Sequence, residues 1–299
     1  MSDTPTPLWL RAAPFIFLLF WSSGYPVSKL GMVYAAPFSF LALRYATVLL
    51  VLAPLALWLR PPLPKRAIDW LHLAMVGFAI QIVYFGGCYG AFAIGTSAGA
   101  VALICSLQPI LVAVLAPLLV GERTSPAGWA GLLLGFAGAL LVIHGYNHAA
   151  HVPLLGVALS VLALCGMTGA TLYEKRFGVT QHPVTANLVQ YAVGFAIALP
   201  IAAAMGFRAA LVPGFLVPML YLVVANSLIS ISLFLAMVRY GRAAQVSALF
   251  YLVPPVASLM AWGLLAERPP ALAWAGMAVA GLGVALTRWQ PKRALKESS

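Results

Sequence analysis

The stretch LVGERTSPAGWAG (residues 119–131) returns 145 positions later as LLAERPPALAWAG (residues 264–276). Both copies carry a Glu-Arg pair followed by Trp-Ala-Gly at the same distance. Outside this stretch, offsets of 145 or 146 align further residues of uncommon type: Pro109 with Pro254, Lys29 with Lys175, Tyr45 with Tyr191, and Pro54 with Pro200. Self-similarity at one fixed offset indicates an internal duplication that covers the whole chain.

The composition is that of a membrane protein. Of the 299 residues, 63% are hydrophobic and 8% are charged, and the mean hydropathy is +0.99. A soluble domain carries about 25% charged residues because its surface must be hydrated. The formal net charge of +11 does not indicate nucleic-acid binding, since the Lys and Arg residues are scattered singly at the ends of apolar segments. Anionic lipid headgroups are the expected partner of that charge.

Ten apolar segments are long enough to cross a bilayer as helices, which takes about 20 residues each. The duplication therefore predicts an all-α membrane protein of two five-helix repeats, residues 1–150 and 151–299. Because five is an odd number, the second repeat crosses the membrane in the opposite sense, as in the inverted repeats of many secondary transporters. The predicted spans are 12–32, 38–59, 70–94, 97–120, 126–144, 153–176, 184–206, 213–238, 243–265 and 270–288.

The positive charges predict the orientation of these spans. With the N-terminus in the cytoplasm, thirteen Lys and Arg residues fall on the inner side, and Lys29, Arg208 and Arg268 fall on the outer side. Cytoplasmic loops carry the excess of Lys and Arg. We therefore expect a multi-pass protein of the cell membrane, in bacteria the inner membrane, with both termini cytoplasmic.

Two kinds of segment resemble one known family. The first is FWSSGYPVSKLG (residues 20–31), followed by Pro37 and LRY (residues 43–45). The second is the pair of repeated junctions, Pro109 with LVGER and Pro254 with LLAER. Both are similar to the EamA-type members of the drug/metabolite transporter superfamily, and the resemblance covers residues 12–288.

The resemblance implies ten helices around a central cavity and the export of metabolites, amino acids or drugs. One feature departs from the related four-helix multidrug antiporters, which carry a membrane-embedded glutamate in the first helix. Here the first helix has no acidic residue, and Glu174 is the only acid near a helix interior. We expect Glu174 to pair with Lys175 and Arg176 beside it, so that transport is facilitative or only weakly proton-coupled.

A polar stripe on the first helix is the first candidate for a cavity wall. Ser22, Tyr25 and Lys29 share one helical face, and adding 146 gives Thr168, Thr171 and Lys175 on the sixth helix. Polar residues facing lipid are costly, which favours a position toward protein or water. The alternative is that both lysines extend to opposite membrane surfaces and anchor the helices.

Arg44 is the most costly residue to place in a membrane, because it lies well inside the second span. Its guanidinium could hold a substrate carboxylate with two hydrogen bonds. Alternatively, it caps backbone carbonyls near Gly24-Tyr25-Pro26, where Pro26 removes a helix donor.

Uncharged polar and aromatic residues at helical spacing complete the candidate site. They suit a cavity for neutral or zwitterionic ligands, although such residues also hold helices together. On the third helix the stripe is Gln81, Tyr84 and Cys88. The further candidate substrate-binding residues are Trp21, Tyr84, Gln108, Asn226 and Tyr251.

Other residue patterns are assigned structural roles. Gly131, Gly135 and Gly138 are spaced for close helix packing. The loop histidines His144, His148 and His151 have loose metal-like spacing but no nearby acid or cysteine, so we expect neither a metal nor a cofactor. The sequence contains no nucleotide-binding P-loop and no set of acid–base partners that would indicate an enzyme.

The sequence thus predicts a secondary transporter, monomeric or homodimeric, that exports amino acids or similar amphipathic metabolites by alternating access. Aromatic residues would hold an apolar side chain, and Arg44 or Lys29 a carboxylate. Three alternatives remain open: a proton-coupled drug exchanger, a sugar-phosphate exchanger, and, from a different class, a membrane enzyme or lipid scramblase.

Overall fold

The computed structural model describes residues 8–96, 101, 104–146, 153–178, 181–256, 259–260 and 269–288. Within these residues the chain is helical, and its one extended pairing is a single antiparallel bridge between Ala35 and Ala209. Five helices of 22 to 28 residues are long and apolar enough to cross a membrane, and five shorter apolar helices accompany them. These helices coincide with the ten predicted spans, so the predicted all-α membrane fold is confirmed.

The elements of the two repeats follow one another in the same order. In the first repeat, α3, η1 and α4 form one continuous helix, as do α10, η2 and α11 in the second. Proline opens α2, α9 and α10, where its missing N–H would have no helical partner. The first repeat comprises α1 (Leu8–Met32), α2 (Pro37–Leu59), α3 (Ala67–Gly77), η1 (Phe78–Tyr84), α4 (Phe85–Ala93), α6 (Gln108–Leu119) and α7 (Pro126–Tyr146). The second comprises α8 (Leu154–Phe177), α9 (Pro183–Ala204), α10 (Pro213–Tyr221), η2 (Leu222–Ser230), α11 (Ile231–Tyr240), α12 (Ala243–Ser247), η3 (Ala248–Leu252) and α14 (Ala271–Arg288).

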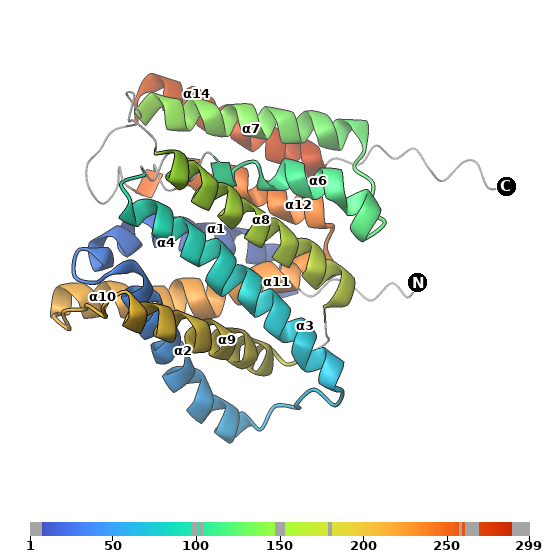
Figure 1. The fold of residues 1–299 in the computed structure, drawn as a ribbon. Helices are drawn as coiled ribbons and strands as arrows, with labels where there is room; N and C mark the ends of the chain where they lie inside the picture. The colour runs from blue at the N-terminus through green and yellow to red at the C-terminus, as the bar shows by residue number, and fades with distance from the viewer. Residues whose placement is uncertain are drawn as a thin grey trace.

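Equivalent helices of the two repeats pack together at opposite edges of the molecule. The pair α7 and α14 lies along one edge and the pair α2 and α9 along the other, with the remaining helices between them (Figure 1). The α7–α14 contact is close because glycines of each helix lie against the backbone of the other. A Cβ on Gly138 would overlap Ala280, and one on Gly276 would overlap Val142. The predicted packing role of the glycine stripe is thereby confirmed.

The outer surface is apolar along the length of these helices. Leu50, Leu57 and Trp58 on α2 are between 73% and 79% exposed, and Leu118 on α6 is 78% exposed. Buried polar side chains, by contrast, gather at the centre, among them Ser22, Gln81 and Ser227. This inversion of the soluble pattern is expected when lipid is the solvent.

Candidate functional site

The third helix of each repeat contains a π-helical segment at the same position, η1 in the first repeat and η2 in the second. Gln81 and Asn226, which are 145 positions apart, lie inside them. A tyrosine of the second helix binds each segment: Tyr45 donates to the carbonyl of Gln81 at 2.6 Å, and Tyr191 donates to that of Ser227 at 3.0 Å. The two tyrosine rings meet at a centroid distance of 5.6 Å, so the repeats join at these residues. Such π segments are frequent at functional sites.

The fourth helix of each repeat is interrupted next to a proline. α6 begins at Gln108, with Pro109 in its first turn, after a turn at residues 106–107. In the second repeat the 3₁₀ segment η3 ends at Leu252, two residues before Pro254. Proline lacks an N–H and crowds the preceding turn, which weakens the helix at these two positions. Interrupted helices at the membrane centre are typical of substrate sites in inverted-repeat transporters.

A pocket with a cavity volume of about 40 Å³ lies between α1, η1, α4 and η2. The Trp21 and Tyr84 rings stack at 6.1 Å, the Asn226 amide donates to the Phe20 carbonyl at 2.6 Å, and a hydrogen bond of 2.9 Å joins Tyr89 to Ser28. None of the described residues lining the pocket is charged. They are Trp21, Gly24, Ser28, Met32, Tyr84, Phe85, Cys88, Tyr89, Phe92 and Asn226. Apolar walls with a few polar groups are characteristic of small-molecule sites.

Three of the predicted substrate-binding residues, Trp21, Tyr84 and Asn226, line this pocket. Phe85, Tyr89 and Phe92 also line it but were missing from the prediction. A signal for them existed, because the third-helix stripe of Gln81, Tyr84 and Cys88 reaches them when it is continued at helical spacing. The side chains of Tyr25 and Lys29 lie outside the described part of the structure.

Arg44 lies beside the pocket rather than in its lining. Its side chain is fully buried, its Nε donates to Ser227 Oγ at 2.8 Å, and its Cζ lies 4.8 Å from the centroid of Phe85, whose ring lines the pocket. Nη1 and Nη2 have no hydrogen-bond partner, so the alternative expectation that Arg44 caps carbonyls near Gly24 is wrong. Among the described residues no carboxylate forms an ion pair with it. A buried charge without a counter-ion is costly, which makes Arg44 a candidate for binding an anionic group.

The remaining predicted residues are buried in the closed interior and do not line the pocket. Gln108 Nε2 donates to Thr171 at 3.2 Å and to Ser247 at 3.1 Å. Its Oε1 has no partner, and the same holds for the hydroxyl groups of Ser22 and Tyr251. Buried polar atoms are normally satisfied, so this region has hydrogen-bonding capacity that the closed structure leaves unused.

Two ion pairs lie at the C-terminal end of α8, one within the second repeat and one that joins the two repeats. Glu174 contacts Arg239 at 2.6 Å, and Lys175 contacts Glu122 at 3.1 Å. Glu122 also accepts a hydrogen bond from the Ala243 N–H at 2.9 Å. The expected pairing of Glu174 with its neighbours Lys175 and Arg176 is wrong, because adjacent residues on a helix do not face each other. We call Glu122, Glu174, Lys175 and Arg239 the ion-pair network.

The pocket and the ion-pair network lie at different levels of α8. Gly87, between the pocket-lining residues of α4, packs against Leu159 and Ala163. Glu174 follows Ala163 by eleven positions, which places it about 16 Å further along the helix at 1.5 Å per residue. The pocket and the ion-pair network are therefore separated along the axis of α8.

The predicted histidine cluster is only partly described, since His148 and His151 lie outside the described residues. Among the residues that the structure does describe, no group of three or more His, Cys, Asp or Glu side chains is placed to hold a metal ion.

Comparison with known proteins adds a family and several relatives. The model of the EamA-like transporter family matches residues 10–144 and again residues 154–289. The chain is 29% identical to a probable terminal-alkyne amino-acid exporter of Streptantibioticus cattleyicolor over 89% of each chain. It is 25% identical to the uncharacterized transporter YvbV of Bacillus subtilis, over 84% of this chain and 82% of that one. One crystal structure matches with a TM-score of 0.82 at 17% identity, covering 97% of this chain and all of the other, which shows the same fold.

Proposed function

The chain belongs to the EamA-like transporter family, and on that premise we propose that it exports amino acids and similar amphipathic metabolites. Transport proceeds by alternating access, as expected for inverted repeats, in the cell membrane and with both termini in the cytoplasm. The names of two relatives support this substrate class. One is the amino-acid exporter named above, and the other is a probable amino-acid metabolite efflux pump of Escherichia coli, 24% identical over 58% of this chain and 56% of that one.

The observation that carries the proposal is the chemistry of the pocket. The cavity itself has a volume of about 40 Å³, which is less than a bound amino acid needs, so the surrounding helices must separate when substrate enters. Trp21, Tyr84 and Phe85 offer flat apolar surfaces to a substrate side chain, and the Asn226 amide offers a polar group without charge. A zwitterion with an apolar side chain matches these walls better than a sugar phosphate, for which a pocket needs cationic groups.

Arg44 supplies the site for the substrate carboxylate. Its two free Nη groups are directed at no protein partner, and the Phe85 ring touches both the guanidinium and the pocket. Displacement of that ring would bring the pocket into contact with Arg44. The bound carboxylate then neutralises a charge that is otherwise buried alone, with two parallel hydrogen bonds.

The position of the ion-pair network supports alternating access. In the predicted orientation, the ends of α8 and α11 and the loop that contains Glu122 all face the cytoplasm. The network closes the interior on that side, while the pocket lies at the level nearer the outside. We infer from this that the chain is closed on the cytoplasmic side, and that inward opening separates Lys175 from Glu122 of the other repeat and Glu174 from Arg239 of the same repeat.

Coupling to protons is weak or absent in this mechanism. A coupled carrier needs a group that binds a proton when it meets the substrate. The described residues lining the pocket include no acid or histidine, and Glu174 is held by Arg239 in the ion-pair network. The substrate gradient alone therefore drives export.

The proposal is tested with purified protein in proteoliposomes. We expect saturable flux of leucine or phenylalanine, and at least about tenfold weaker flux of the corresponding amines, which lack the carboxylate and leave Arg44 unpaired. Asn226→Leu, nearly isosteric, should reduce the flux, while Cys165→Ala, at an exposed cysteine that does not line the pocket, should not. Saturable flux of amines or nucleosides without flux of any amino acid would refute the substrate assignment.

A further inference from the structure

A second hollow lies at the end of the molecule that carries the ion-pair network, between the start of α3 and the end of α8. Its volume is about 710 Å³, and it is open to the surface. Three cationic side chains line it, Lys65, Arg66 and Arg176, together with His72 and the single acid Asp69. We call this hollow, bounded by these five residues, the basic cleft.

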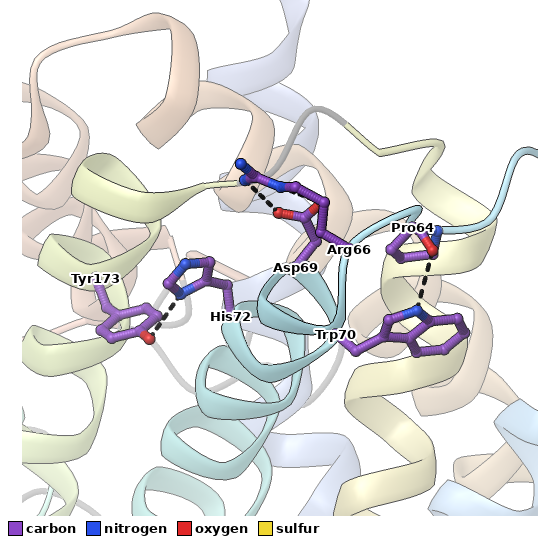
Figure 2. Close-up of polar contacts among 6 residues, drawn as sticks. All are labelled: Pro64, Arg66, Asp69, Trp70, His72 and Tyr173. Atoms are coloured by element: carbon purple, nitrogen blue, oxygen red, sulfur yellow. Dashed lines mark hydrogen bonds and ion pairs between the residues drawn. The ribbon is translucent and has the colours of Figure 1, made fainter.

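The floor of the basic cleft is rigid and aromatic. His72 Nδ1 lies 2.8 Å from the Tyr173 hydroxyl, and the His72 ring is parallel to Phe177 at a centroid distance of 5.1 Å. Arg176 lies over the same Phe177 ring, 5.2 Å from its centroid. Figure 2 shows His72 directed toward Tyr173, across the contact between α3 and α8. The two walls belong to different repeats, so a ligand in the cleft would touch both.

The cations in the cleft are not fully used by the protein. Arg66 donates to Asp69 at 2.8 Å and 3.3 Å, yet its side chain remains 73% exposed (Figure 2). Lys65 forms no ion pair among the described residues. Arg176 uses Nη1 to donate to the Leu119 carbonyl at 2.8 Å, which leaves its other N–H groups available. One acid against three fixed cations gives the cleft a net positive charge.

The surroundings of the cleft have side chains typical of the boundary between membrane and water. Trp70, 39% exposed, donates its indole N–H to the Pro64 carbonyl at 3.1 Å (Figure 2), and tryptophan is enriched at that boundary. Leu63 and Leu71 beside it are 63% and 52% exposed. This arrangement of cations above exposed apolar side chains fits an amphiphilic ligand. Its phosphate would lie at the level of Lys65 and Arg176, and its acyl chains would lie below.

We propose that the basic cleft binds the phosphate headgroup of an anionic phospholipid on the predicted cytoplasmic side. The phosphate contacts Lys65, Arg66 and Arg176, and the acyl chains lie along the apolar surface near Leu63 and Leu71. By touching α3 of one repeat and α8 of the other, the lipid stabilises the arrangement in which the two helix ends meet. This site is separate from the transport pocket and does not depend on the identity of the transported substrate.

The test measures lipid binding to the purified full-length protein in mild detergent. Phosphatidylglycerol, phosphatidylcholine, and inorganic phosphate are titrated separately, with thermal unfolding and native mass spectrometry as readouts. We expect phosphatidylglycerol to raise the melting temperature and to remain bound, and phosphatidylcholine to do so much less. Lys65→Gln and Arg176→Gln should each weaken the apparent affinity for phosphatidylglycerol about fivefold. Arg208→Gln, a matched loss of charge on the predicted outer side, should leave it unchanged.

Arg176 also binds the Leu119 carbonyl, so Arg176→Gln can change stability without lipid. The variants are therefore compared by the change in melting temperature that lipid causes, not by the melting temperature before lipid is added. Lys65→Gln removes no described contact and keeps the test valid if Arg176→Gln is unstable. Equal effects of phosphatidylcholine and phosphatidylglycerol, or equal losses in Arg208→Gln, would overturn the proposal. A shift of the same size with inorganic phosphate alone would overturn the assignment to a lipid.

Discussion

Removing Arg239 should open the cytoplasmic side of the transporter. In the ion-pair network, the Glu174 side chain is 1% exposed and that of Arg239 is 23% exposed. Arg239→Gln therefore leaves a buried carboxylate without a counter-ion, at a cost of about 3 kcal/mol to the closed arrangement. Glu174→Gln leaves only a partly hydrated arginine and should cost about 1 kcal/mol.

If the ion pair exists only in the closed arrangement, its loss shifts the equilibrium between closed and open forms. At 1.4 kcal/mol per tenfold change, about 3 kcal/mol corresponds to about a 100-fold shift in Arg239→Gln. The double variant Glu174→Gln/Arg239→Gln should shift less than Arg239→Gln, because it no longer buries an unpaired charge.

The assay is the rate at which a thiol reagent modifies Ser247→Cys from the cytoplasmic side, in a variant without native cysteines. Ser247 is fully buried and follows Ala243, which contacts the ion-pair network, by four positions. Modification should be faster in Arg239→Gln, by up to about 100-fold. Arg60→Gln serves as the control, since Arg60 is exposed and forms no ion pair in the described structure. An unchanged rate in folded Arg239→Gln would refute the role of the network as a gate.

Three further predictions concern packing, orientation and coupling. Gly138→Val should lower stability by more than about 2 kcal/mol because a side chain there overlaps the α14 backbone, while Gly281→Ala, with open space around it, should be nearly neutral in thermal unfolding. Reporter fusions after Arg66 should read cytoplasmic and fusions near His148 external, and the reverse pattern would contradict the topology. Glu174→Gln should retain amino-acid flux without an imposed pH difference, whereas strict dependence on a proton gradient that this variant abolishes would reveal coupling through Glu174.

The spans and the duplication could be predicted because they depend on local properties of the sequence. Hydrophobicity decides which segments enter a bilayer. Residues such as Tyr45 and Tyr191 can be matched in the sequence by their fixed offset, without knowledge of their contacts in the fold. Their positions in the structure retain that equivalence, since each donates to the π segment of its own repeat across 36 positions. The π segments themselves could not be predicted, because they depend on these tertiary hydrogen bonds rather than on a local pattern.

The structural difference between the two repeats could not be predicted from the sequence either. Ser28 and Glu174 are equivalent at an offset of 146, yet Ser28 lines the pocket and Glu174 lies in the ion-pair network. The partners of Glu174 and Lys175 come from other helices and loops, which no helical spacing brings together. A repeated sequence predicts the same local structure for both repeats. A single conformation of the transporter, however, opens one side of the membrane and closes the other.

Native Cys88 in the wall of the pocket allows a direct test of whether amino acids occupy the pocket from the outer side. With Cys105 and Cys165 replaced by alanine, the measurement is the rate of Cys88 modification by a membrane-impermeant thiol reagent applied to either face of membrane vesicles. We expect modification from the outer face, slowed by saturating leucine or phenylalanine. Modification from the cytoplasmic face alone, or a rate that no amino acid changes, would contradict that expectation.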